Sequence, residues 1–230
     1  MRVGTVEDIE QIEAVLNHPT CRQWMGPGFR DLHVDPMSFV DNVTLLVQDG
    51  EKTEGVIFFE HIGIGVYAAL VAMTGQARGL VSVAEGKKAL RYLFTATDAI
   101  TVMGTIDSGN QGGCRMALAM GLTMDYVYGS RLVCRLGLDQ FCMTDREFIR
   151  VGKEVLAASD IPCESTEEAG MIGFLKVADE WANTQKGMLA FNAWALLCHM
   201  PEVVPMSENL SSFSYRGKEL VLQAVHSGVL

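Results

Sequence analysis

One junction constrains the fold of this chain more than any other feature. Residues 74–81, Thr-Gly-Gln-Ala-Arg-Gly-Leu-Val, join an apolar strand candidate at 65–73 to a helix candidate with apolar residues at helical spacing over 80–94. The strand candidate is continuously apolar, which is typical of a strand buried on both faces. A helix that starts directly after a strand offers unpaired main-chain N–H groups and the positive end of its dipole. The junction therefore predicts a loop that suits a pyrophosphate.

The elements after this loop favour the same interpretation. Residues 99–106 form another strand candidate, and Asn110 begins a helix candidate of small residues at 113–119, which Gly121 ends. An ordinary strand-to-helix turn remains the alternative for the loop, because glycine-rich turns are common. The order strand, loop, helix, strand, asparagine, helix, glycine and strand favours phosphate binding.

Two motifs in this order resemble the GNAT superfamily of acyl-CoA-dependent N-acetyltransferases over residues 1–138. The pyrophosphate motif of that family, Gln/Arg-x-x-Gly-x-Gly/Ala, falls on Gln76, Gly79 and Val81, with valine at the last small position. A second family pattern, Asn-x-x-Ala, then Tyr, then Gly-Phe, falls on Asn110, Gly113, Ala117, Gly121 and Leu122. Asparagine and glycine match there, whereas Ala117 occupies the tyrosine position.

The resemblance implies an α/β (α+β) fold, with a GNAT-like mixed and mostly antiparallel sheet flanked by helices. The first residues fit this order, because a short strand at 2–4 precedes a capping-box-like helix start at Thr5-x-x-Asp8. Strand candidates at 43–47 and 55–59 flank an Asp-Gly turn and predict a hairpin. Residues 126–129 and 131–138 supply the last strands.

The resemblance also implies acetyl-CoA, or CoA, as the cofactor. In the family, the strand before the loop holds the pantetheine arm, and the loop amides hold the pyrophosphate. Arg78 is the charge partner expected for the phosphates. The resemblance thus assigns cofactor binding to Val71, Ala72, Met73, Gln76, Ala77, Arg78, Gly79, Leu80, Val81 and Asn110.

Catalysis by direct attack of an amine on the thioester requires a base, and the sequence offers Glu60 and Tyr67. Each has a structural alternative, because Glu60 is also consistent with a solvated strand end and Tyr67 with packing. The tyrosine that would protonate the thiolate is replaced by Ala117, and Val81 adds methyl groups close to the phosphates. The sequence therefore leaves open whether the chain is an enzyme.

A narrower resemblance, carried by residues 77–79, 88–90, 93–98 and Asn110, is to GNAT-like proteins of short-tailed bacteriophages. It implies an alternative function: a non-catalytic GNAT-fold protein that acts in virion or head assembly, or as a virion component. The partner of an enzyme would be a small amine or a protein amine. A structural protein would bind other virion proteins or itself.

Composition excludes other classes. The 230-residue chain has a net charge of −10 and a sequence pI near 4.9, which argues against a nucleic-acid surface. Its six cysteines are scattered without a Cys-x-x-Cys pair, so neither a metal site nor a disulfide framework is expected. No leader and no membrane-length apolar run is evident. We expect a cytoplasmic protein, in the host cytoplasm or the virion if it is phage-encoded, with no membrane or nucleic-acid partner.

The resemblance ends near residue 140, and residues 141–230 are expected to form a mainly helical C-terminal domain. Capping-box sequences at 144–147 and 165–168 predict two helices, and a further helical run is expected at 187–198. Residues 213–215 and 219–225 could pair as a terminal hairpin. This part carries no chemical motif, and it either caps the first domain or binds a partner.

Overall fold

The computed structural model describes residues 1–24, 31–182, 203–205, 212–216 and 218–221. Two compact units divide the chain. Unit 1 comprises Met1–Leu90 and Thr101–Leu136, and unit 2 comprises Arg91–Ile100 and the described residues from Gly137 onward. The domain boundary expected at residue 140 stays a prediction.

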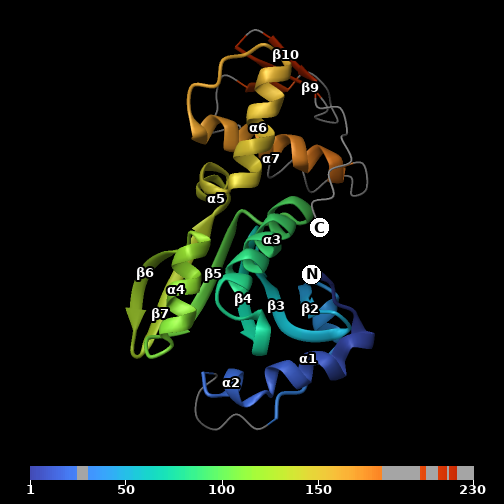
Figure 1. Ribbon diagram of the computed structural model, residues 1–230, viewed down its shortest axis with the longest axis vertical. Helices are drawn as coiled ribbons and strands as arrows, with labels where there is room; N and C mark the ends of the chain where they lie inside the picture. Colours follow the sequence, from blue (N-terminus) through green and yellow to red (C-terminus); the bar gives the residue numbers. More distant parts are fainter. Residues whose placement is uncertain (25–30, 183–202, 206–211, 217, 222–230) are drawn as a thin grey trace. The chain divides into compact units, whose positions relative to one another are not determined.

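Unit 1 is built on a seven-stranded sheet with the order β1-β2-β3-β4-β5-β7-β6 (Figure 1). The pairs β1–β2, β2–β3, β3–β4 and β6–β7 are antiparallel, and β4–β5 is parallel. This mostly antiparallel sheet with flanking helices confirms the predicted fold class. The strands are β1 (Arg2–Val3), β2 (Val43–Asp49), β3 (Lys52–Gly63), β4 (Val66–Met73), β5 (Thr101–Asp107), β6 (Thr123–Tyr128) and β7 (Arg131–Gly137).

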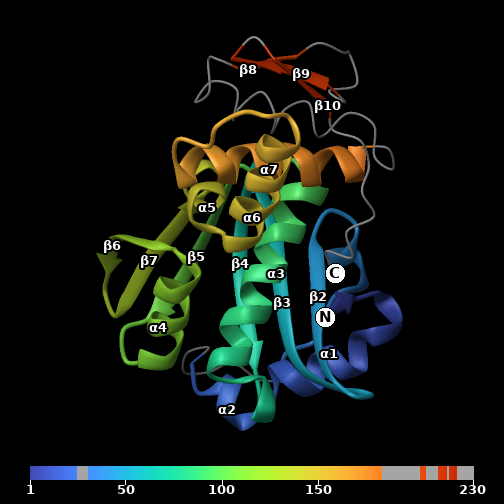
Figure 2. The ribbon, with the colours of Figure 1, turned by 45° about the horizontal axis from the view of Figure 1, so that its top comes forward.

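The helices of unit 1 follow the expected order. They are η1 (Val6–Asp8), α1 (Ile9–Leu16), α2 (Pro19–Arg22), η2 (Pro36–Phe39), η3 (Gly75–Ala77), α3 (Leu80–Ala96) and α4 (Gln111–Met120). The Thr5–Asp8 capping box is formed, and Gly121 ends α4 in the left-handed conformation with φ of 99°. Figure 2 shows α3 in front of β3 and β4, and both views draw α2 beside the C-terminal end of β4.

Strand pairing defines the two faces of this sheet, because directly opposite residues in an antiparallel pair point to the same face. Val56 pairs with Leu46 and Ala72, and all three pack with residues of α1 and with Cys21 of α2. We call this side the α1 face. Alternation along β3 and β4 then places the pair Glu60–Ala68 on the α1 face and the pair His61–Tyr67 on the opposite one.

Unit 2 has a core of stacked aromatic rings. Phe94, Phe141, Phe148 and Phe174 form a chain with ring-centroid separations of 5.4, 5.8 and 5.7 Å. The rings come from the end of α3 and from three helices, α5 (Leu138–Thr144), α6 (Arg146–Ala158) and α7 (Thr166–Ala182). A three-stranded antiparallel sheet completes the unit, made of β8 (Val203–Pro205), β9 (Ser212–Tyr215) and β10 (Lys218–Val221).

Local differences from the expectations have physical causes. The first cap of unit 2 was expected at Thr144, but Thr144 ends α5 and Asp145 caps α6 by accepting from the N–H groups of Glu147 and Phe148. A carboxylate beside the helix dipole makes a favourable cap there. The helix expected at 187–198 lies outside the described residues. None of the helices described is long and apolar enough to span a membrane.

Candidate functional site

The two parallel strands at the centre of the sheet diverge. Pairing of β4 with β5 begins at Val66–Thr101 and ends at Ala69–Gly104, although both strands continue. Beyond that point the side chains of Leu70 and Val71 are 39% and 38% exposed. The expectation that this strand is buried on both faces is therefore wrong at Leu70 and Val71, although Ala72 and Met73 are buried. We call the interval between the two strands beyond this last pair the opening.

The edge of β4 along this opening carries main-chain groups that β3 does not use. Thr74 donates its N–H to Glu54 O at 2.7 Å, and Gly65 O accepts from Thr101 N–H at 3.0 Å. Because hydrogen bonds alternate along an antiparallel pair, these two bonds direct the N–H and C=O groups of odd-numbered residues toward β5. Val71 thus directs its main-chain groups to the opening, whereas Ala72 directs its groups to β3. The carbonyl of Met73 already accepts from Arg78 Nε and Cys21 Sγ. Cofactor binding by Val71, Ala72 and Met73 stays a prediction.

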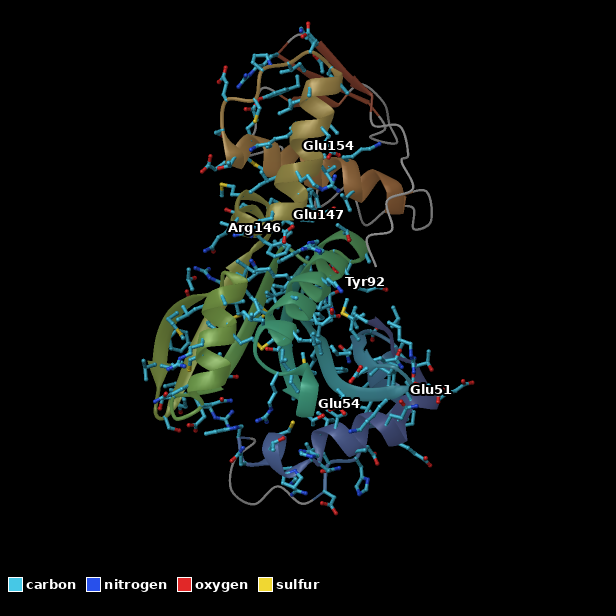
Figure 3. All side chains as sticks on the ribbon, viewed as in Figure 1. Glu51, Glu54, Tyr92, Arg146, Glu147 and Glu154 are labelled. Carbon is cyan, nitrogen blue, oxygen red and sulfur yellow. The ribbon has the colours of Figure 1, made fainter. Side chains whose placement is uncertain are left out.

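A carboxylate fixes the start of the loop after β4. Thr74 donates its hydroxyl to Glu54 Oε2 at 2.6 Å and to Glu54 O at 2.9 Å. Figure 3 shows Glu54 beside the end of β4. Hydrogen bonds from Lys52 and then Thr74 lower the pKa of Glu54 from its usual value. Sequence reasoning missed this pair, because a Glu in a strand and a Thr twenty residues later carry no recognisable spacing.

The first two residues of α3 are exposed, and their amides have no partner in the part of the chain that the structure describes. Among the described residues, no acceptor binds the main-chain N–H groups of Gly79, Leu80, Val81 or Ser82. Gly79 has φ of +71°, and a Cβ placed on it would meet nothing within 4 Å. The side chains of Leu80 and Val81 are 89% and 47% exposed. Gly79, Leu80 and Val81 are thus exposed at the positive end of a helix, where an anion is favoured, whereas Ser82 is 5% exposed.

Other residues assigned to the cofactor have structural contacts. Arg78 donates Nε to Met73 O at 3.2 Å and Nη2 to Thr20 O at 3.2 Å. Asn110 caps α4 by accepting from Gly113 N–H at 2.9 Å. Arg78 therefore joins the loop to α2, and these contacts give it no phosphate-facing role. Cofactor binding by both residues stays a prediction.

The remaining loop residues differ in what they offer. Ala77 is buried, and its N–H is already bonded to Thr74 O at 3.0 Å. The side chain of Gln76 lies outside the described set. Among the described residues, the amides without a partner thus lie after Ala77, later in the loop than the motif alone indicates.

The two candidate catalytic residues, Glu60 and Tyr67, lie on opposite faces of the sheet. Glu60 is exposed on the α1 face, one residue away in register from Ala69, where β4 and β5 separate. Tyr67 is 6% exposed on the opposite face, and its ring lies 5.1 Å from the ring of His61. The packing alternative describes Tyr67 well, whereas Glu60 lies close to the inner end of the opening.

The position of the family's tyrosine offers no side-chain donor. Ala117 is 4% exposed, and Tyr126 and Tyr128 are largely exposed on β6. Burial raises the pKa of the Cys21 thiol, whose Sγ donates to Met73 O at 3.4 Å. Among the described residues, no group of three or more His, Cys, Asp or Glu side chains could hold a metal ion.

Comparison with known proteins supports the fold. The sequence matches no protein-family model and no curated protein. AAC(6')-Ib in complex with paromomycin and acetyl-CoA matches with 13% identity and a TM-score of 0.52, over 64% of this chain and 97% of that one. A domain from Methanocaldococcus jannaschii matches with 12% identity and a TM-score of 0.51, over 60% of this chain and 96% of that one.

At these identities the similarity concerns architecture only. The GNAT domain of S. lividans PAT is similar as well, with 13% identity and a TM-score of 0.49 over 60% of this chain and 89% of that one. The chain therefore has the fold of the GNAT acetyltransferases.

Proposed function

We propose that this protein is an acetyl-CoA-dependent N-acetyltransferase that acts on a small amine or a protein amine. One observation carries the proposal: the opening between β4 and β5 ends at accessible, unpaired N–H groups at the start of α3. Acetyl-CoA contains an extended arm and a pyrophosphate, which these two features suit. A bound acetyl-CoA in the similar AAC(6')-Ib complex supports the same assignment.

The residues present fit the cofactor. The arm would lie along Val71 and Met73, and the pyrophosphate would accept from the N–H groups of Gly79, Leu80 and Val81. The exposed position of Val81 leaves these donors accessible, so its larger side chain does not close the loop. When bound, acetyl-CoA supplies the acetyl thioester.

The chain's own part in the reaction is orientation and proton transfer. Glu60 lies on the α1 face near the inner end of the opening, where it can accept a proton from the attacking amine. The buried alanine at position 117 provides no proton for the departing thiolate. Solvent then supplies the proton to the departing thiolate. A group that stabilises this thiolate should raise the rate of acetyl transfer.

Calorimetry with acetyl-CoA, together with mass spectrometry of amines incubated with it, tests this proposal. We expect saturable binding and an amine-dependent gain of an acetyl group. Glu60→Gln should keep acetyl-CoA binding and lower the rate about 100-fold, in the range of general-base catalysis. No binding at millimolar acetyl-CoA would overturn the proposal.

A non-catalytic role is the second candidate, and the buried Ala117 favours it, because the family's proton donor is lost. In that case the protein would act through other proteins or through itself, as the phage resemblance implies. Binding of acetyl-CoA without acetylation of any amine by the wild type would favour this candidate. The bacteriophage and virion assignments stay predictions.

A further inference from the structure

An aromatic ring and a carboxylate flank one glycine after β5. A Cβ placed on Gly109 would lie 3.1 Å from Asp107 Oδ1 and 3.7 Å from Trp24 Cζ3. The same Asp107 Oδ1 accepts from Gly109 N–H at 2.9 Å. The ring of Trp24 thus lies within van der Waals range of the turn after β5, beside the Asp107 carboxylate.

This pair lies at the outer end of the opening. Cys21 Sγ of α2 contacts the carbonyl of Met73, the last residue of β4, and Arg78 joins Thr20 O to that carbonyl. Trp24, two residues after α2, reaches Gly109 beyond the last residue of β5. The segment from α2 to Trp24 therefore contacts the end of β4 and the turn after β5. Cys21 packs on the α1 face, the face that carries Glu60.

Asp107 has neutral partners only among the described residues. Its Oδ1 accepts from the main chain of Gly109, and its Oδ2 accepts from the hydroxyl of Ser130 at 3.4 Å. No described Lys, Arg or His makes an ion pair with it. Trp24 remains 40% exposed, so the ring is accessible to a ligand. A negative charge without a cation beside an accessible indole suits an ammonium group, because ring and carboxylate both attract it.

We propose that Trp24 and Asp107 form a subsite for a second, protonated amine of a polyamine-type acceptor. The inference rests on the proposed function, because it assigns the acceptor of the same reaction. Asp107 lies three residues beyond Gly104, the last paired residue of β5. At the rise of a strand this is about 10 Å from Gly104. Glu60 lies two strand spacings across the sheet and in register with Met103, so its Cα is about 16 Å from that of Asp107. Both side chains extend several ångströms from their Cα atoms, so an acceptor with two amines about 10–16 Å apart can place one beside Glu60 and the other at Asp107.

The two amines need opposite protonation states. An alkylamine with a pKa near 10.4 is charged at neutral pH, and the attacking nitrogen must lose its proton before it reacts. Glu60 serves that nitrogen, while Asp107 favours the charged form of the other. Charge at one end of the acceptor thus provides orientation without blocking attack at the other end.

Steady-state acetylation of spermidine and of octylamine, which has one amine, tests the subsite. We expect Asp107→Asn to raise the KM for spermidine about tenfold, the sum of a modest ion pair and a cation–π contact, and to leave octylamine unchanged. Asparagine keeps an acceptor for Gly109 N–H, so the turn is preserved. Trp24→Leu should raise the spermidine KM about threefold. Glu51→Gln, in the exposed β2–β3 turn, removes the same charge elsewhere and should change neither KM.

Binding measurements separate this inference from the proposed function. Spermidine is titrated without acetyl-CoA and followed by tryptophan fluorescence, with Trp24→Phe identifying the signal of that residue among the three tryptophans. Binding of spermidine that Asp107→Asn abolishes, in a protein that binds no acetyl-CoA, would support the subsite and overturn the transferase. Normal acetyl-CoA binding with spermidine parameters unchanged by Asp107→Asn would overturn the subsite alone.

Discussion

Gly79 combines two properties that an anion-binding loop needs. Its φ of +71° turns the chain so that successive N–H groups converge, and the space around its Cα is open. Other residues adopt that conformation at a cost of about 1–2 kcal/mol. A side chain here would also stand where a ligand approaches the main chain.

We expect Gly79→Ala to lower the free energy of unfolding by about 1 kcal/mol and to weaken acetyl-CoA binding about tenfold or more. Calorimetry and urea unfolding measure both quantities. Gly50→Ala is the matched control, because Gly50 also has a positive φ, +59°, and open surroundings, but lies in the β2–β3 turn. It should show the same loss of stability with unchanged affinity. Equal affinity losses in the two variants would contradict the assignment of the loop.

Glu168 is the residue that joins the small sheet of unit 2 to α7. Its carboxylate accepts from Tyr215 Oη at 2.5 Å and from the N–H groups of Glu164 and Ser165, and Arg216 lies 3.3 Å away. Burial alone would raise the pKa of Glu168, but these contacts outweigh it, so the pKa is lowered. The charged form is therefore the one that stabilises the folded state.

We expect Glu168→Gln to cost about 1–3 kcal/mol at pH 7, because a charged acceptor is lost from several buried donors. A carboxylate with a lowered pKa stabilises above its unfolded pKa of about 4.3, and the gain is lost as the pH falls through the lower folded value. The wild type and the variant should therefore converge in stability below about pH 4. Urea unfolding across pH 3–7 measures this difference.

Glu154→Gln is the control for that series, because Glu154 pairs with Arg150 on an exposed part of α6. Exposed pairs contribute little, so a change below about 0.5 kcal/mol is expected. A Glu168→Gln difference that stays constant down to pH 3 would show that the effect is not electrostatic.

At the scale of elements, α6 and α7 pack with their backbones in contact. A Cβ on Gly152 would lie 1.7 Å from Ala169 O, and one on Gly173 would lie 1.8 Å from Phe148 O. Real Cβ atoms do not approach so closely, and the obstacle in each case is main chain, which cannot rotate away. Glycine at these positions therefore sets the separation of the two helices, and the phenylalanine rings fill the space beside it.

We predict that Gly152→Ala lowers the free energy of unfolding by about 3 kcal/mol, at the upper end of overpacking costs. Gly112→Ala in α4 should have the opposite sign, because its Cβ would meet only Asn110 Oδ1 at 3.7 Å. There alanine gains up to about 1 kcal/mol from helix propensity. Thermal unfolding of both variants compares them, and a neutral Gly152→Ala would contradict the close packing.

Sequence patterns predicted the positions of helices and strands better than they predicted which residues are exposed and which face of the sheet a residue occupies. Hairpin β2–β3, the loop before α3 and the end of α4 at Gly121 follow from local turn and capping chemistry, which the sequence contains directly. The exposure of Leu70 and Val71 was not predictable, because it depends on where β5 leaves β4. The separation of Glu60 and Tyr67 onto opposite faces required the register of β3 with β4.

The same limit applies to the candidate site. The motif indicated amides after Gln76, but only coordinates show that Ala77 is already bonded and that Arg78 contacts α2. Trp24 and Asp107 come from distant segments without a shared motif, and both lie beside Gly109. Long-range neighbours of this kind have no signal in one sequence.

At the scale of the whole molecule, α3 contributes to both units. Its last residues belong to unit 2, where Phe94 packs on Phe141 and Arg91 donates to Asp145 Oδ1 at 3.0 Å. A chain cut after residue 140 would keep the end of α3 but lose these partners. Phe94 is fully buried in the intact protein, so its ring would become accessible.

We expect residues 1–140 alone to melt at a lower temperature than the full chain and to bind an apolar dye. Differential scanning fluorimetry and dye titration measure both properties. Substituting Phe94→Ser in the fragment should reduce dye binding, because it removes the exposed ring. A fragment as stable as the full chain, without dye binding, would mean that the first domain is complete at residue 140.

The central claim is that main-chain N–H groups at the start of α3 hold a diphosphate. An amide-resolved NMR titration of the ¹⁵N-labelled protein with CoA tests it most directly. The account predicts saturable shifts of the Gly79, Leu80, Val81 and Ser82 amides at one common Kd, with the Gly50 amide unchanged. Binding of CoA that leaves these four amides unmoved would contradict it.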